Sequence, residues 1–189
     1  MKKAFVSGLM LLASSTAWAG WSVDNDLSRV SFVSVKNNTV GESHYFKKVK
    51  GTLSKGGQLQ VEIPLASVET NIPIRNQRLQ NMLFETGQFA TAMLTAQIDN
   101  KALKLAVGSS KIIKVEADLG LHGVNALINV EVMITKVAKD KLQAISVKPI
   151  IINPATFGLD KGVAKLQAVA GLAGITQSVP VSFVLTLSN

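Results

Sequence analysis

Two neighbouring segments alternate between apolar and polar residues, and this period of two constrains the fold more than any other feature of the chain. In residues 113–121 every second side chain is apolar, with Lys, Glu, Asp and Gly between them, and residues 128–134 repeat the pattern. Such alternation is typical of strands that bury one face. Only a short stretch that begins with His122 and Gly123 separates the segments, which therefore predict an antiparallel β-hairpin.

Further segments carry similar apolar runs, at residues 29–35, 59–63, 93–98, 103–107, 142–152 and 179–187. We therefore expect a total of about eight or nine strands. Strands that follow one another through short turns are antiparallel, because parallel neighbours need long crossover connections. Residues 73–83 and 162–172 instead space their apolar side chains as a helix does, with Thr70 or Asn71 available to cap the first of them. The chain is predicted to be mainly β, with two short helices.

The alternation alone does not distinguish a closed barrel from a two-sheet sandwich, since both bury one face of every strand. The apolar positions hold many Ala and Val residues and few aromatic residues. Small inward side chains favour a barrel of about eight strands, because they leave an apolar cavity instead of a filled core. A two-sheet sandwich remains the alternative fold at this point.

The N-terminus has the three parts of a secretory signal peptide. Lys2 and Lys3 precede an apolar run over residues 4–13, and small residues lead to Ala17 and Ala19. The run is shorter than the roughly 20 residues that a membrane-spanning helix needs. We expect residues 1–19 to be cleaved and residues 20–189 to form one domain in the periplasm. A retained N-terminal anchor is the alternative.

Charge and cysteine content limit the partners and the chemistry. Without Lys2 and Lys3 the chain has 18 basic and 12 acidic residues, a formal charge of +6. The basic residues are scattered, whereas nucleic-acid binding needs a clustered basic face, so we expect no nucleic-acid partner. Contact with anionic membrane headgroups is more plausible physically, but a solvated basic surface is a simpler explanation of the charge than either kind of binding. The chain has no cysteine, which excludes disulfides and thiol chemistry. The sequence leaves open whether the chain forms a homodimer.

Short motifs follow one another in a fixed order over nearly all of the chain after residue 19: WSVD (21–24), SRVSF (28–32), GTL (51–53), SVETNIPIRNQRL (67–79), ADLGLHGV (117–124) and NPATFGL (153–159). Their order resembles that of the YceI-like family of bacterial periplasmic proteins. Residues 67–79 are the most specific match. Asn76 stands where the family usually has Asp, and Leu83 where it has the first of two Phe residues. Phe89 and Ala90 replace a Tyr-Pro pair, and NPATFGL lacks an Arg that is common there. The resemblance implies one lipocalin-like antiparallel β-barrel that binds a polyisoprenoid or another long-chain lipid.

The predicted ligand contacts are mostly aromatic. Several phenylalanines are spread over the strands and the helix edge, where a ligand cavity would contact them. We expect ligand contacts from Phe32, Phe84, Phe89, Phe157 and Phe183. Core packing explains each of these residues equally well. Arg75 is the one polar candidate, and Arg78 lies on the same face of the predicted helix. These arginines help to close the barrel end or hold a polar head group. More simply, they dock the helix by binding backbone carbonyls or the carboxylates of Glu69 or Glu85.

An enzyme needs a constellation of reactive groups that this chain does not display. Its two histidines are His44 and His122, and it has neither the zinc-binding His-Glu-x-x-His motif nor the Gly-x-Ser-x-Gly nucleophile turn. We expect no catalytic residue, no metal and no cofactor. An enzyme that uses His44 or His122 is the weakest alternative. A stronger alternative is a packed scaffold that acts on an envelope partner, which a filled interior without a pocket of about 300 Å³ would favour.

Overall fold

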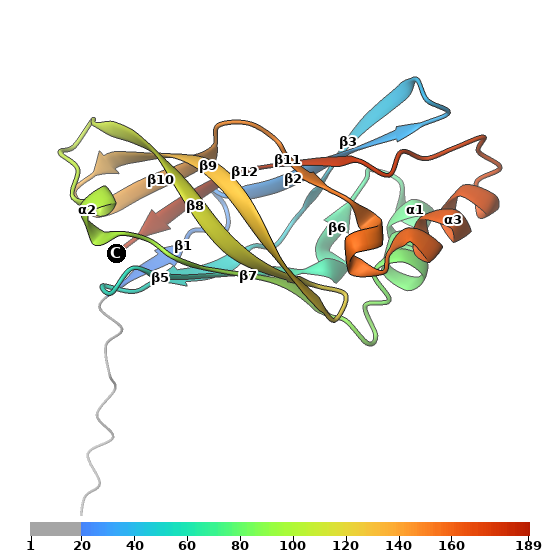
Figure 1. The fold of residues 1–189 in the computed structure, drawn as a ribbon, viewed down its shortest axis with the longest axis horizontal. Helices are drawn as coiled ribbons and strands as arrows, with labels where there is room; N and C mark the ends of the chain where they lie inside the picture. The colour runs from blue at the N-terminus through green and yellow to red at the C-terminus, as the bar shows by residue number, and fades with distance from the viewer. Residues whose placement is uncertain (1–19) are drawn as a thin grey trace, which may run out of the picture.

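The computed structural model describes residues 20–189, and the predicted signal peptide at residues 1–19 lies outside the described residues (Figure 1). Residues 20–189 form twelve antiparallel strand segments. They are β1 (Trp21–Val23), β2 (Arg29–Lys36), β3 (Val40–Phe46), β4 (Lys50–Leu53), β5 (Gln58–Pro64), β6 (Val68–Glu69), β7 (Thr91–Gln97), β8 (Ser110–Leu121), β9 (Val124–Ala138), β10 (Lys141–Ser146), β11 (Ile150–Ile152) and β12 (Val179–Ser188).

The twelve segments make a closed barrel of eight strands, which confirms the barrel and excludes the sandwich. Four barrel strands are continuous, namely β7, β8, β9 and β12. Each of the other four is interrupted and consists of two segments: β1 and β2, β3 and β4, β5 and β6, and β10 and β11. Both halves of an interrupted strand share their neighbours: β12 pairs with β1 and with β2, and also with β10 and with β11. The pairing of β1 with β12 closes the ring.

The predicted hairpin is the longest paired unit of the barrel. Strands β8 and β9 pair from Ser110 opposite Thr135 to Leu121 opposite Val124. Two residues connect them, His122 with φ of 52° and Gly123 with φ of 77°. Positive φ at both positions is the mark of a type I′ turn, whose twist matches that of the flanking strands.

Short helical segments complete the fold: the 3₁₀ turns η1 (Leu65–Ser67) and η3 (Pro154–Phe157), the π-helical turn η2 (Leu79–Leu83), and helices α1 (Pro73–Arg78), α2 (Asn100–Leu103) and α3 (Asp160–Val169). Figure 1 shows α1 and α3 together at one end of the barrel and α2 at the other. Helix α3 packs on η2 through Gly162, where an added Cβ would lie 2.7 Å from the carbonyl oxygen of Met82. Within residues 20–189, no helix is long and apolar enough to span a bilayer.

Three sequence predictions about local structure are wrong. Residues 103–107 are not a strand, because the side chain of Asp99 caps helix α2 and the N–H of Leu105 then donates to the carbonyl of Leu103 in a turn. Residues 142–152 form two strands, because residues 147–149 leave the ladder between β10 and β11. The capping position of α1 is Ile72, without a side-chain cap from Thr70 or Asn71.

Candidate functional site

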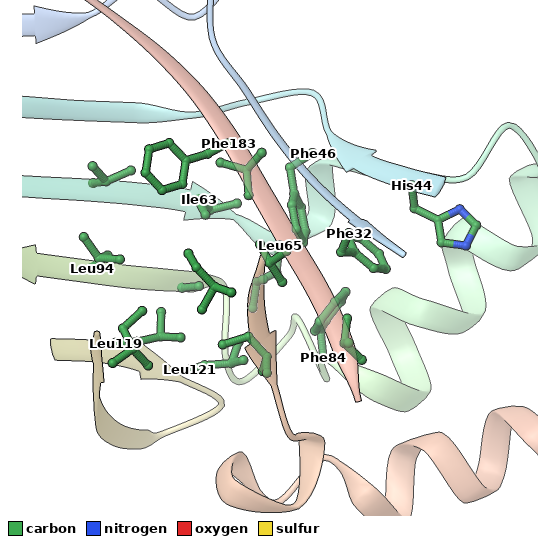
Figure 2. Close-up of a pocket in the computed structure, with 18 of the residues that line it drawn as sticks. Phe32, His44, Phe46, Ile63, Leu65, Phe84, Leu94, Leu119, Leu121 and Phe183 are labelled. Atoms are coloured by element: carbon green, nitrogen blue, oxygen red, sulfur yellow. The ribbon is translucent and has the colours of Figure 1, made fainter. Parts of the chain in front are cut away.

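The barrel encloses a cavity of about 480 Å³, shown in close-up in Figure 2. Its volume exceeds the roughly 300 Å³ at which ligand pockets begin. The inward residues of β8 illustrate its wall, since Ile113, Val115, Ala117, Leu119 and Leu121 all line it. The interior is therefore neither filled nor polar, which is evidence against the packed-scaffold alternative.

Small side chains on the inner wall explain why space remains. Ala92 on β7, Ala117 on β8 and Ala144 on β10 all line the cavity. Ala92 and Ala117 are buried, with exposed fractions of 6% and 1%. A larger apolar residue at these positions would fill the volume, as in barrels of this size whose interior is packed.

Aromatic rings gather on one side of the cavity. Figure 2 shows Phe32, Phe46 and Phe84 close together there, with ring centroids 5.6 Å apart for Phe32 and Phe46 and 6.0 Å apart for Phe46 and Phe84. Of the predicted site residues, Phe32, Arg75, Phe84 and Phe183 line the cavity. Phe46 also lines it, although the sequence analysis did not select it.

Phe89 and Phe157, also predicted as ligand contacts, do not line the cavity. Phe157 lies in η3 and is packed against the protein, with 2% of its surface exposed. Phe89 follows η2, and the centroid of its ring lies 4.2 Å from the ring centroid of His122. Both belong to connections outside the barrel wall, where no strand alternation indicates which side faces the interior.

Most polar side chains that line the cavity belong to β2, β3 and α1. They are Ser34, Lys36, Glu42, His44, Arg75 and Arg78, and Thr176, which follows α3, also lines the cavity. On β2 and β3, Val30 pairs with Phe46, Phe32 with His44, and Ser34 with Glu42. The wall thus becomes more polar, pair by pair, towards the end of the β2–β3 hairpin.

Glu42 is the acidic centre of this polar end. Its Oε2 lies 2.7 Å from Nη1 of Arg75 and 3.1 Å from Nζ of Lys36. Burial alone would raise the pKa of Glu42, but the two cations outweigh it and hold that pKa below its usual range. Arg75 also donates from Nη2 to the carbonyl of Thr70, at 2.8 Å. Of the roles expected for Arg75, binding a backbone carbonyl is present, whereas its carboxylate partner is Glu42 instead of Glu69 or Glu85.

His44 lies deeper, with 3% of its surface exposed. Its Nε2 is 3.0 Å from the hydroxyl of Ser34, and its ring meets that of Phe32 edge-on. Burial, assisted by the positive charge of Arg75, lowers the pKa of His44, so the ring is neutral at pH 7. Among buried side-chain atoms of residues 20–189, Nδ1 of His44 and Nε of Arg75 lack a hydrogen-bond partner.

A hydrogen-bond network fixes the loop that presents α1 to the cavity. Asn76 accepts from the N–H and the hydroxyl of Thr70 and donates to Glu69. Glu69 also accepts from the N–H of Asn71 and pairs with Lys47. The Asn76 amide, the Lys47 ammonium and the Asn71 N–H lower the pKa of Glu69 to about 2.

His122 belongs to a different part of the molecule. Its Nδ1 lies 3.2 Å from the carbonyl oxygen of Phe157 and its Nε2 lies 3.2 Å from Oε2 of Glu85. Unlike His44, it does not line the cavity, so the two rings form no shared site. In the described part of the chain, no three His, Cys, Asp or Glu side chains lie close enough to hold a metal ion.

Comparisons with known proteins agree with this geometry. A family model for the YceI-like domain matches residues 21–187. The chain belongs to the YceI-like family. A search of curated protein sequences gave no match.

Three solved structures are similar to the chain. A polyisoprenoid binding domain from Saccharophagus degradans, implicated in plant cell wall breakdown, is 35% identical with a TM-score of 0.87, and the match covers 89% of this chain and 97% of that domain. BcnA of Burkholderia cenocepacia is 18% identical with a TM-score of 0.64, over 87% of this chain and 98% of BcnA. The YCEI protein of Campylobacter jejuni is 18% identical with a TM-score of 0.56, over 77% and 84%. At 18% identity, the last two share the fold alone with this YceI-like chain.

Proposed function

We propose that this YceI-like protein is a non-enzymatic periplasmic carrier that holds a long-chain isoprenoid or a similar lipid inside its barrel. The observation that carries the proposal is the apolar cavity of about 480 Å³. The likeness to a polyisoprenoid binding domain at 35% identity supports the lipid class. The signal-peptide pattern of residues 1–19 supports export.

An apolar cavity suffices to bind a long chain. Burial of each CH₂ group contributes about 0.8 kcal/mol, and ten such groups offset much of the cost of ordering the lipid, which is several kcal/mol. Few polar contacts are needed, which explains why the sequence contains no sharp ligand motif. A carrier in the water-filled space between two membranes shields the chain from water.

The polar residues at one end of the cavity give the lipid an orientation. Arg75 lines the cavity and keeps Nε without a partner, and Arg78 lines it from the same helix. In this proposal the two arginines hold the head group, while Phe32, Phe84 and Phe183 contact the chain. Loading also requires a transient contact with a membrane surface.

Native mass spectrometry of the protein purified from the periplasm tests the proposal. We expect a mass above that of the chain by one lipid, and extraction should release a long-chain compound. The N-terminal sequence of the same sample should begin at Gly20. A ligand-free mass under gentle conditions, together with no uptake of added polyprenols, would contradict lipid carriage.

A further inference from the structure

At the end of the barrel that carries α1 and α3 (Figure 1), some apolar side chains line the cavity and are also exposed to solvent. Ile72 and Ile74, at the start of α1, both line the cavity, yet 43% and 53% of their surface is exposed to solvent. Leu172 and Ile175, which follow α3, also line it. We call these four residues the mouth rim. Exposed apolar side chains that gather at one place are typical of a surface that contacts a membrane or a partner.

The segment that contributes Leu172 and Ile175 to the mouth rim carries no charge. No charged residue follows Lys165, and residues 168–175 read AVAGLAGI. Val169 in this stretch is 43% exposed. The stretch and the start of α1 thus form two apolar sides of the same opening, since both contribute lining residues.

Positive charge accompanies the mouth rim. Lys36, Arg75 and Arg78 line the same end of the cavity, against the single carboxylate of Glu42. The formal charge of this group is therefore +2. Apolar side chains next to basic residues are the combination that binds an anionic lipid surface, because the former enter the interface and the latter meet the headgroups.

We propose that the mouth rim docks on a membrane that contains anionic lipids, so that the cavity opens directly into the bilayer. This inference rests on the proposed function and specifies the face that the carrier uses. A lipid chain then passes between bilayer and barrel without crossing water. The opposite end of the barrel, which carries α2 and β1 (Figure 1), faces away from the membrane.

Fluorescence quenching by brominated lipids tests which face docks. The chain after residue 19 contains one tryptophan, Trp21 in β1, at the end of the barrel away from α1 and α3 (Figure 1). In vesicles of phosphatidylglycerol and brominated phosphatidylcholine we expect Ile74→Trp to be quenched and Trp21 of the wild type not to be. The control is Val107→Trp, in the connection between α2 and β8, where the native valine is 61% exposed.

A binding assay gives a second readout on the same vesicles. Ile74→Asp should lower partitioning about tenfold, because it places a charge where the proposed docking would bury an apolar side chain, whereas Val107→Asp should leave partitioning within about twofold. Salt should weaken binding, since it screens headgroup attraction. Both aspartate variants replace exposed residues, and thermal unfolding verifies that they fold.

Three results would contradict docking through the mouth rim without contradicting lipid carriage. The first is quenching of Val107→Trp in place of Ile74→Trp. The second is equal partitioning of both aspartate variants while native mass spectrometry still detects bound lipid. The third is a dimer in sedimentation that Ile74→Asp dissociates, which would assign the mouth rim to a second copy of the chain.

Discussion

Nη1 of Arg75 lies 2.7 Å from Oε2 of Glu42, so that helix α1 is tied to strand β3 across one side of the cavity. Both side chains are about one quarter exposed, at 25% and 29%. The pair connects an element outside the barrel wall to a strand of the wall, and it leaves the remaining guanidinium donors for other partners.

This ion pair should contribute modestly to stability. In a double-mutant cycle of Glu42→Gln and Arg75→Gln, followed by urea denaturation, we expect a coupling free energy of about 1 kcal/mol, because partial exposure screens the charges. The more exposed pair of Lys50 and Glu62, 3.7 Å apart, should give less than about 0.5 kcal/mol. A coupling at the second pair as large as at the first would argue against this ranking.

Arg75 should discriminate between lipid head groups. Arg75→Gln is expected to weaken binding of geranylgeranyl phosphate about tenfold, since a charge-assisted hydrogen bond is lost. Binding of a head-free hydrocarbon with the same chain should change by less than about twofold. Calorimetric titration of both ligands measures the difference. Equal losses for both would mean that Arg75 acts on the cavity as a whole and not on the head group.

Filling the cavity should abolish lipid binding and preserve the fold. Ala117→Phe places a ring in the cavity from an inner-wall position that is 1% exposed. Native mass spectrometry should then show the chain without lipid, while circular dichroism still reports a β-barrel. Leu127→Phe is the matched control, because Leu127 lies on the paired strand β9 and is 68% exposed. Retained lipid in Ala117→Phe would place the ligand elsewhere.

Glu69 should make stability depend on pH in the acid range. Its folded-state pKa of about 2 lies below the usual 4.5, so the ionised form is favoured by folding. The stabilisation is complete above pH 4.5 and is lost as the pH falls towards 2. Urea denaturation should therefore separate the wild type from Glu69→Gln at pH 7 and bring the two curves together near pH 2. A constant separation would show that the carboxylate charge is not responsible.

Gly162 should be intolerant of a side chain. In Gly162→Ala the new methyl group would lie 2.7 Å from the carbonyl oxygen of Met82 and 2.9 Å from Cα of Leu83, both backbone atoms that cannot turn away. We expect a loss of about 1–3 kcal/mol in the free energy of unfolding. Gly41→Ala is the control, because nothing lies within 4 Å of an added Cβ there. Equal stability of the two variants would mean that α3 can shift away from η2.

Much of the barrel could be predicted from the alternation of apolar and polar residues. The strand predicted at residues 103–107 was wrong for a physical reason. Strands β8 and β9 bury one face along their length, so their period of two is visible. Residues 103–107 also alternate, since Leu103 and Leu105 are half-buried and Lys104 is exposed, but no strand lies beside them to pair with. Burial pattern alone does not show where the backbone hydrogen bonds go.

Of the residues predicted for the candidate site, Phe32, Arg75, Phe84 and Phe183 line the cavity, whereas the polar residues of β2 and β3 were not predicted. Strand β3 escaped detection because two of its inward residues are Glu42 and His44, which make an inner face look like an outer one. Phe46 on the same strand was lost with it. Polar residues on the inner face thus hid the alternation of β3, and only the pairing with β2 in the structure shows which of its side chains point inwards.

The interruptions of four strands divide the barrel into two tiers. One tier is a complete ring, from β1 through β4, β5, β7, β8, β9, β10 and β12 back to β1. The other is an open wall of β11, β2, β3 and β6 beside β12, and it carries the polar end of the cavity. The ring therefore closes the barrel, whereas the open wall supplies Ser34, Lys36, Glu42 and His44 to the cavity. For the proposed carrier, we expect substitutions in the open wall to change the preferred head group while the ring keeps the barrel closed.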